Sequence, residues 1–333
     1  MSAITTIEIG VPGSKTRVPR IGLGTMGMSL IFGSVDDEES VRVLNHAIDI
    51  GCTFWDTADV YGLGHNERLI ARVLKERRDK VFLCTKFGIT VCQPEPGEKS
   101  HFMDLVNGVN GKPEYVRKCI ENSLERLGTD YVDLYYSHRI DPTTPIEETV
   151  AAMAELVKEG KVKYIGLSEC TPEELRRAHK MHPIAAIQME YSPLYAEIET
   201  NGIFDTCREL GVTIVAYSPL SRGFLTSKIR SFDDFTEDDW RRTNPRFKPE
   251  HFANNLKLVD AFESMAEKNG CKPGQLGLAW LLAQEENMVI IPGTKKIKYL
   301  DENVAAGQIK LSNDELKELR SLVDNADIQG TRY

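Results

Sequence analysis

The chain has 333 residues, of which 41% are hydrophobic and 27% charged, and its formal net charge is −9. This composition is that of a globular protein with a large core, and the acidic balance argues against a nucleic acid or an acidic membrane surface as main partner. No apolar stretch reaches the roughly 18 residues of a transmembrane helix, and residues 1–20 hold no signal-peptide segment, so a cytoplasmic location is expected.

Strand-like and helix-like segments alternate along the chain. Short apolar runs predict eight strands, at Ile21–Gly27, Thr53–Thr57, Val81–Phe87, Val132–Ser137, Tyr164–Ser168, Ala185–Glu190, Thr213–Tyr217 and Met288–Pro292. Apolar residues at helical spacing predict helices at Glu38–Ile50, Asn66–Arg78, Pro113–Leu127, Ile146–Glu159, Pro172–Lys180, Phe204–Leu210, Leu276–Gln284, Lys298–Ala306 and Asn313–Ala326. Thr171 and Ser312 are expected to cap two of these helices.

This alternation predicts parallel strands joined by helices. Eight such units without a break in composition favour an α/β fold, a single (β/α)₈ TIM barrel over residues 1–333. A doubly wound sheet that binds a dinucleotide would carry G-x-G-x-x-G after its first strand, and Gly22–Gly27 lacks that spacing. Residues 1–20 are expected to form a hairpin that closes the N-terminal mouth of the barrel.

Two long stretches, residues 88–112 and 221–252, interrupt the alternation. Both follow strands and so belong to the C-terminal face, where barrel enzymes place their sites. Loops of this length are often lids or binding loops, and a tolerated surface insertion is the alternative. The second loop is acidic in its middle and offers few anchors to the core. Without a cofactor, its cations Arg222 and Lys228 would face each other with no anion between them. We therefore expect a clasp that closes over a bound cofactor.

Cysteine and histidine spacing argues against disulfides and metals. The seven cysteines form no C-x-x-C pair, and the seven histidines show no H-x-x-x-H spacing. We therefore expect free thiols in a reducing compartment and no metal site.

Four polar residues, Asp56, Tyr61, Lys86 and His138, are each assigned to the C-terminal end of a short apolar run. Polar groups at the ends of buried parallel strands are oriented and still reachable. A carboxylate, a phenol, an ammonium and an imidazole at successive strand ends suggest acid catalysis by a tuned tyrosine. Singly, each has a structural alternative: a solvated charge, a tyrosine that caps a turn, or a histidine satisfied within the core.

Seven segments carry a resemblance to a known family: residues 22–26 (GLGTM), 54–62 (FWDTA…YG), 85–87 (TKF), 135–138 (YYSH), 166–168 (GLS), 188–192 (QMEYS) and 291–295 (IPGTK). Their order and spacing resemble the aldo-keto reductases from about residue 15 to 325. The resemblance extends to the fungal and plant branch that includes pyridoxal reductase-like and perakine reductase-like enzymes. It implies reduction of aldehydes or ketones to alcohols by hydride transfer from NADPH.

The resemblance implies that Tyr61 donates the proton and that His138 orients the substrate oxygen. A tyrosine with its ordinary pKa of about 10 is a poor acid–base partner. An ammonium about 4 Å away contributes up to roughly 4 kcal/mol at an effective dielectric near 20, so Lys86 is expected to lower the pKa of Tyr61. Asp56 would keep Lys86 charged and aimed.

The resemblance also implies a nucleotide site. Its expected members are Gly24, Thr25, Met26, Asp56, Ser168, Gln188, Tyr217, Ser218, Pro219, Leu220, Arg222, Gly223, Lys228, Gly293, Thr294, Lys295, Glu302 and Asn303. Tyr217 would stack on the nicotinamide, and Ser168 and Gln188 would bind its carboxamide. Lys295 and Lys296 would hold the 2′-phosphate, which favours NADP over NAD.

Two positions depart from the family pattern. Glu169 stands where many members have Asn, and this puts the contact next to Ser168 in doubt. Tyr299 stands where many have Arg, so selectivity for the phosphate must rest on the lysines.

Other functions stay open at this point. Lys86 could form a Schiff base, as in an aldolase. A redox-sensing regulatory module resembling potassium-channel β-subunits would share fold and cofactor. As an enzyme, the chain is expected to act on small aldehydes, aromatic ones included, with pyridoxal as a candidate, and to be a monomer or a weak homo-oligomer.

Overall fold

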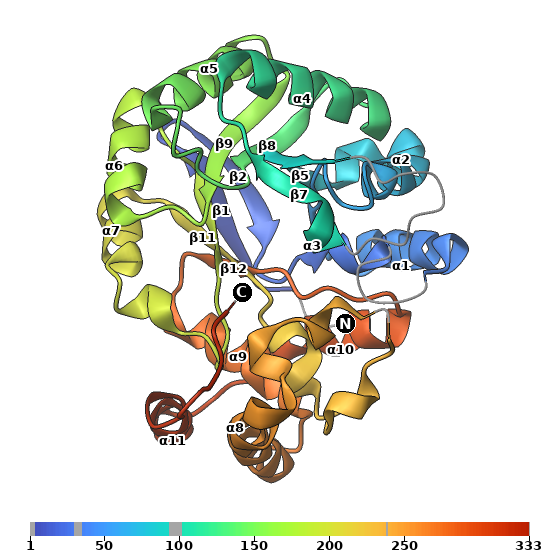
Figure 1. Cartoon of the computed structure of the whole chain (residues 1–333), viewed down its shortest axis with the longest axis vertical. Coiled ribbons are helices and arrows are strands. Elements are labelled where there is room, and N and C mark those ends of the chain that lie inside the picture. The colour runs from blue at the N-terminus through green and yellow to red at the C-terminus, as the bar shows by residue number, and fades with distance from the viewer. Residues whose placement is uncertain (1–3, 30–34, 93–101, 238, 333) are drawn as a thin grey trace.

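Eight parallel strands form the centre of the protein in a computed structural model, which describes residues 4–29, 35–92, 102–237 and 239–332. The strands are β3 (Leu23–Gly24), β4 (Phe54–Asp56), β5 (Phe82–Phe87), β8 (Val132–Ser137), β9 (Val162–Ser168), β10 (Ala186–Glu190), β11 (Thr213–Tyr217) and β12 (Met288–Ile290). They are hydrogen-bonded in chain order, and bridges from Ile21 to Ile290 and from Gly24 to Gly293 join the first strand to the last. The predicted barrel is confirmed (Figure 1).

Helices surround the strands (Figure 1). They are α1 (Asp37–Asp49), α2 (His65–Arg77), α4 (Pro113–Leu127), α5 (Ile146–Lys158), α6 (Pro172–Met181), α7 (Ile203–Leu210), α8 (Pro249–Lys268), α9 (Pro273–Gln284), α10 (Ile297–Ala305) and α11 (Asn313–Asp324). Short 3₁₀ segments occur at η1 (Met26–Met28), η2 (Arg78–Lys80), η3 (Glu197–Glu199) and η8 (Ala306–Gln308). Thr171 and Ser312 form the expected capping boxes, with Glu174 and Glu315 respectively.

Helix α8, with 20 residues, was not predicted from the sequence. Its buried line runs through Phe252, Asn255, Leu258, Phe262 and Met265, which is a helical spacing. The polar Asn255 interrupts the apolar pattern of that line. Its amide is satisfied by backbone groups of neighbouring segments, which explains how a polar residue is accommodated there.

Both long loops contain more structure than expected. In the first, β6 (Ile89–Val91) pairs antiparallel with β7 (Val106–Val109), and α3 (Phe102–Leu105) precedes β7; residues 93–101 lie outside the described part. The second contains η4 (Ser221–Thr226), η5 (Phe232–Asp234), η6 (Trp240–Arg242) and η7 (Pro245–Phe247). The first strand of the barrel is shorter than predicted, because residues Met26–Met28 form a 3₁₀ segment.

The second loop also contains buried side chains that attach it to the core, contrary to the prediction from the sequence. Phe224, Phe235, Phe247 and Phe252 are all buried, and their rings pack edge to face with centroids 5.1–6.3 Å apart. The expectation of a poorly anchored clasp is therefore wrong. Aromatic burial offsets the entropy of ordering this segment.

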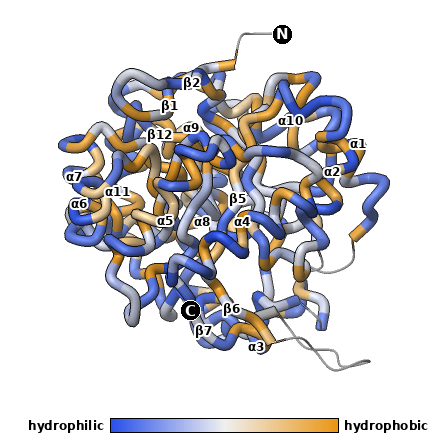
Figure 2. Tube along the Cα trace, turned by 90° about the horizontal axis from the view of Figure 1, so that it is seen from above, coloured by the Kyte–Doolittle hydropathy of each residue, from blue (hydrophilic) through white to orange (hydrophobic). Residues whose placement is uncertain are grey.

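The N-terminal hairpin closes one end of the barrel, as predicted. Strands β1 (Thr6–Val11) and β2 (Ser14–Pro19) pair antiparallel. Ile9 and Val18 join a buried cluster with Phe54, Leu134 and other barrel residues. Figure 2 shows this hairpin at one end of the molecule, with β6, β7 and the C-terminus at the other. Among the described residues, no helix has the length and apolar character needed to cross a membrane.

Replacing Ile9 by Ala tests the role of the hairpin. The side chain is fully buried, so its truncation should lower the free energy of unfolding by about 2–5 kcal/mol. The exposed neighbour Glu8, replaced by Ala, should change it by less than about 0.5 kcal/mol. Urea unfolding measures both, and similar small effects would show that the hairpin contributes little to the core.

Candidate active site

A buried lysine gathers the predicted catalytic residues. Lys86 in β5 is fully buried, and its Nζ donates to Asp56 Oδ1 at 2.5 Å, to the Thr57 carbonyl oxygen at 2.8 Å and to Tyr61 OH at 3.2 Å. His138 follows β8, and its ring lies edge-on to that of Tyr61 with centroids 6.0 Å apart. The structure therefore brings all four residues together.

Tyr61 reaches this cluster from a turn rather than from a strand end. It lies between β4 and α2, and its N–H donates to the Ala58 carbonyl. Gly62 follows with φ +56°, and a Cβ there would lie 2.9 Å from Ser29 Cβ. The assignment of Tyr61 to a strand end was thus wrong, and a tight turn delivers its phenol instead.

Asn66 fixes that turn and was not singled out from the sequence. Its side chain is fully buried, and its Oδ1 accepts from Thr25 Oγ1 at 2.6 Å and from Thr57 Oγ1 at 2.7 Å. Its amide N–H groups donate to the Thr25 carbonyl and to Ser29 Oγ. The sequence offered one signal for Asn66, namely a polar residue in the first turn of a predicted amphipathic helix.

Burial dominates the protonation of the site. It raises the pKa of Tyr61 above its usual value, although the Lys86 charge acts in the opposite direction. Lys86 thus acts in the expected direction, but burial outweighs it. Burial acts to lower the pKa of Lys86, but Asp56 and Tyr61 more than offset this, so the pKa of Lys86 is raised.

Burial, together with the charges of Lys86 and Arg139, holds the pKa of His138 well below its usual value. The imidazole is therefore neutral at pH 7 and has one N–H to donate.

A cavity of about 860 Å³ opens over these residues at the C-terminal ends of the strands. All 18 residues predicted for the nucleotide site line it, together with Tyr61 and His138. Lining residues that the sequence did not single out include Ile89, Val106, Arg139, Trp240 and Arg241. These residues lie in the two long loops and just after β8. Sequence patterns do not predict the conformation of such segments, so the residues could not be assigned to the cavity.

Two polar side chains, Ser168 at the end of β9 and Gln188 within β10, present hydrogen-bonding atoms at this cavity. Ser168 Oγ is buried and has no hydrogen-bond partner within the described residues. Gln188 donates its amide N–H to Asp56 Oδ2 at 2.7 Å, so it is tied to the Lys86 cluster. Asp56 thus connects the catalytic candidates to the predicted carboxamide site.

Several cations line the same cavity. Lys295 is half-buried, and burial, Arg241 and Lys296 lower its pKa. Lys296 pairs with Glu39 at 2.5 Å, and Arg241 pairs with Asp239. Such a cluster of cations is suited to an anion. Across the described residues, no group of His, Cys, Asp and Glu side chains could hold a metal ion.

The two cations expected to face each other across an empty phosphate site have other partners. Arg222 pairs with Glu190 at 3.1 Å. Lys228 lies over the ring of Tyr299, 3.7 Å from its centroid, and is hydrogen-bonded to its hydroxyl. The physical premise of the clasp, two cations that face each other with no anion between them, is therefore contradicted.

Comparisons with known proteins are consistent with one family. The profile of the Aldo/keto reductase family matches residues 20–324. An aldo-keto reductase of Schizosaccharomyces pombe, named with NADP(+), is 48% identical over 99% of this chain and 95% of that protein. An aldo-keto reductase of Strobilurus tenacellus is 50% identical over 96% of this chain and 93% of that protein.

Solved structures agree with these relatives. A glycerol dehydrogenase from Gluconobacter oxydans superposes with a TM-score of 0.85 at 29% identity, over 97% of each chain. An aldo/keto reductase from Klebsiella pneumoniae, in complex with NADP and acetate, gives 0.71 at 27% identity, over 98% of this chain and 99% of that one.

The depressed pKa of His138 predicts a pH effect on stability. The unfolded chain takes up a proton on this side chain near pH 6.5, whereas the folded protein does not. The free energy of unfolding should therefore decline as the pH falls below about 6.5, and His138→Gln should reduce that decline. Urea unfolding at pH 5.5 and 7.5 measures it. An equal difference in wild type and His138→Gln would contradict the prediction.

Proposed function

Since the chain belongs to the aldo/keto reductase family, an oxidoreductase family, we propose that it reduces aldehydes and ketones to alcohols with NADPH. The membership expected from the motifs is thereby confirmed. One observation carries the proposal: the buried Lys86 ammonium contacts both Asp56 and the Tyr61 hydroxyl beside a large cavity.

The cavity fits NADP by the groups that it presents. NADPH, when bound, supplies the hydride to the carbonyl carbon. Ser168 Oγ and the amide oxygen of Gln188 would bind the carboxamide, and the Tyr217 ring would support the nicotinamide. Lys295 and Lys296 would hold the 2′-phosphate, which accounts for the charge gathered there.

Tyr61 is the proton donor in this proposal. Its raised pKa keeps the phenol protonated at neutral pH, so a proton is available for the carbonyl oxygen. As the phenolate forms, the Lys86 ammonium 3.2 Å away would stabilise it by about 5 kcal/mol at an effective dielectric near 20. Neutral His138 would donate its N–H to the same oxygen and so orient the carbonyl group.

The contacts of Lys86 argue against a Schiff-base enzyme. Its three donors are engaged by Asp56, Thr57 and Tyr61, and its pKa is raised. A lysine that attacks carbonyls needs a lowered pKa and a free amine.

Apolar groups near Tyr61 favour compact substrates. Met26, Ile89 and Val91 pack against the small buried cluster that contains Tyr61, and Met26 and Ile89 also line the cavity. Small aldehydes, aromatic ones included, suit such walls, and pyridoxal is one candidate.

Tyr61→Phe keeps the ring and removes the transferable proton. We expect kcat to fall by about 10²- to 10⁴-fold while the Kd for NADPH stays nearly constant. The measurement follows NADPH absorbance with a panel of aldehydes and NADPH binding by fluorescence. A variant with most of its kcat would exclude Tyr61 as the donor. A wild type that binds NADPH but reduces no aldehyde would favour the regulatory-module alternative.

Replacing Lys295 and Lys296 by Ala tests cofactor choice. Charge-assisted bonds to the 2′-phosphate contribute about 1.5–3 kcal/mol each, so the Kd for NADPH should rise tenfold or more. The Kd for NADH should change little, because NADH lacks that phosphate. Equal losses for both cofactors would show that the lysines act only through general charge or stability.

A further inference from the structure

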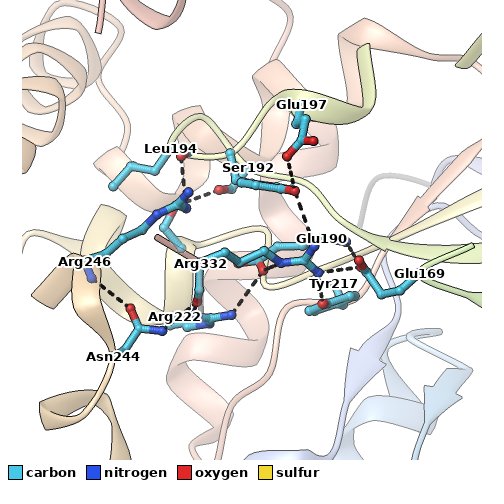
Figure 3. A network of polar contacts seen from close by, with 12 residues as sticks. Glu169, Glu190, Ser192, Leu194, Glu197, Tyr217, Arg222, Asn244, Arg246 and Arg332 are labelled. Atoms are coloured by element: carbon cyan, nitrogen blue, oxygen red, sulfur yellow. Dashed lines mark hydrogen bonds and ion pairs between the residues drawn. The ribbon is translucent and has the colours of Figure 1, made fainter. Parts of the chain in front are cut away.

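One guanidinium connects three neighbouring strand ends beside the cavity (Figure 3). Arg332 Nε donates to Glu190 Oε2 at 2.5 Å, and its Nη2 lies 2.6 Å from Glu169 Oε1. Nη2 also donates to the hydroxyl of Tyr217. These three partners follow or end β9, β10 and β11, which are adjacent in the barrel.

The network is too well buried to be an ordinary surface ion pair. The side chains of Glu190, Glu169 and Arg332 are 3%, 13% and 17% exposed. Glu169 has φ +55°, an unusual conformation for a residue other than glycine, and its Oε1 also accepts from the Glu190 N–H at 3.0 Å. The departure noted at this position thus has a structural role, since an Asn side chain carries no charge to pair with Arg332.

The backbone of Arg332 fixes a second residue of the nucleotide site. Its carbonyl oxygen accepts from Arg222 Nη1 at 3.2 Å and from Asn244 Nδ2 at 2.9 Å. Arg222 also donates to the Glu190 oxygen that Arg332 contacts. Gly330, with φ +85°, allows this approach, because a Cβ there would lie 2.8 Å from Arg246 N.

We propose that Arg332 is a positioning residue for the cofactor. Arg332 holds the Tyr217 ring and sets the charge beside the nicotinamide. The inference rests on the proposed function, in which Tyr217 supports that ring. The guanidinium carbon lies 5.8 Å from the Tyr217 ring centroid. The nicotinamide of NADP⁺ carries a positive charge and that of NADPH does not. A cation behind Tyr217 therefore disfavours the oxidised cofactor relative to the reduced one.

The charges around Tyr217 determine the direction in which a substitution changes the preference between NADP⁺ and NADPH. Two carboxylates, Glu169 and Glu190, face two guanidiniums, Arg222 and Arg332. Arg139 and Arg246 act on the same carboxylates from further away. Loss of the Arg332 charge makes the surroundings of Tyr217 more negative by one unit, and loss of the Glu169 charge makes them more positive by one unit.

The test measures cofactor affinity rather than turnover. Titration calorimetry gives the Kd for NADPH and for NADP⁺ in the wild type and in Arg332→Gln. We expect the substitution to lower the ratio of the NADP⁺ Kd to the NADPH Kd by about threefold to tenfold. Arg332→Lys keeps the charge but loses the planar fork, so it should weaken both cofactors and keep the ratio within about twofold of the wild type.

Glu169→Gln removes a negative charge instead of a positive one, so it should raise the ratio of the NADP⁺ Kd to the NADPH Kd. The matched control is Arg176→Gln on α6, the same change at an exposed pair with Glu209 of α7, which should alter neither constant. Thermal unfolding without cofactor checks that each variant folds. Equal changes in both constants in Arg332→Gln, or a fall of the ratio in Glu169→Gln, would overturn the proposal. A wild type that binds neither cofactor would instead overturn the proposed function.

Discussion

A lysine ammonium without access to water can stay charged only beside a counter-charge, and the site is arranged around this requirement. Removing Lys86 and Asp56 from water costs several kcal/mol for each ion, and only close geometry with further hydrogen bonds offsets it. The Asp56 carboxylate, the Thr57 carbonyl and the Tyr61 hydroxyl satisfy the three donors of the ammonium. The position of the phenol is therefore determined by the same contacts that make the buried charge tolerable.

The barrel extends this arrangement outward. The second carboxylate oxygen of Asp56 accepts a hydrogen bond from Gln188 in β10, a strand that is not a neighbour of β4. Asn66 holds the turn of Tyr61 to the residue that follows β4. Strands thus hold Asp56 and Lys86, and the turn that carries Tyr61 is fixed to the end of β4 and to the start of α2. Such support is what precise catalytic geometry requires.

Most strands could be predicted because their signals are local, and so could Asp56, Lys86 and His138, whereas Tyr61 lies in a turn and not at a strand end. A strand buried on both faces is an apolar run, and a polar residue at its end is visible in the sequence. Helix α8 was missed because Asn255 breaks its apolar line, and the partners that satisfy this amide are distant in the chain. Arg332 gave no signal either, since it meets Glu190 across 142 positions of sequence. The net rise of the Tyr61 pKa was not predicted, because burial depth cannot be obtained from residue order.

The aromatic anchors of residues 221–252 have a consequence for how such a site diversifies. Phe224 packs against Phe247 and against Phe252 of α8, so this segment is fastened to a helix and not to the strands β4 and β5 that carry Asp56 and Lys86. Side chains that point from it into the cavity, such as Trp240, can therefore be exchanged without disturbing the buried charges. Gene duplication followed by drift at such positions, with Arg222, Gly223 and Lys228 kept, would yield enzymes with different preferences and unchanged chemistry.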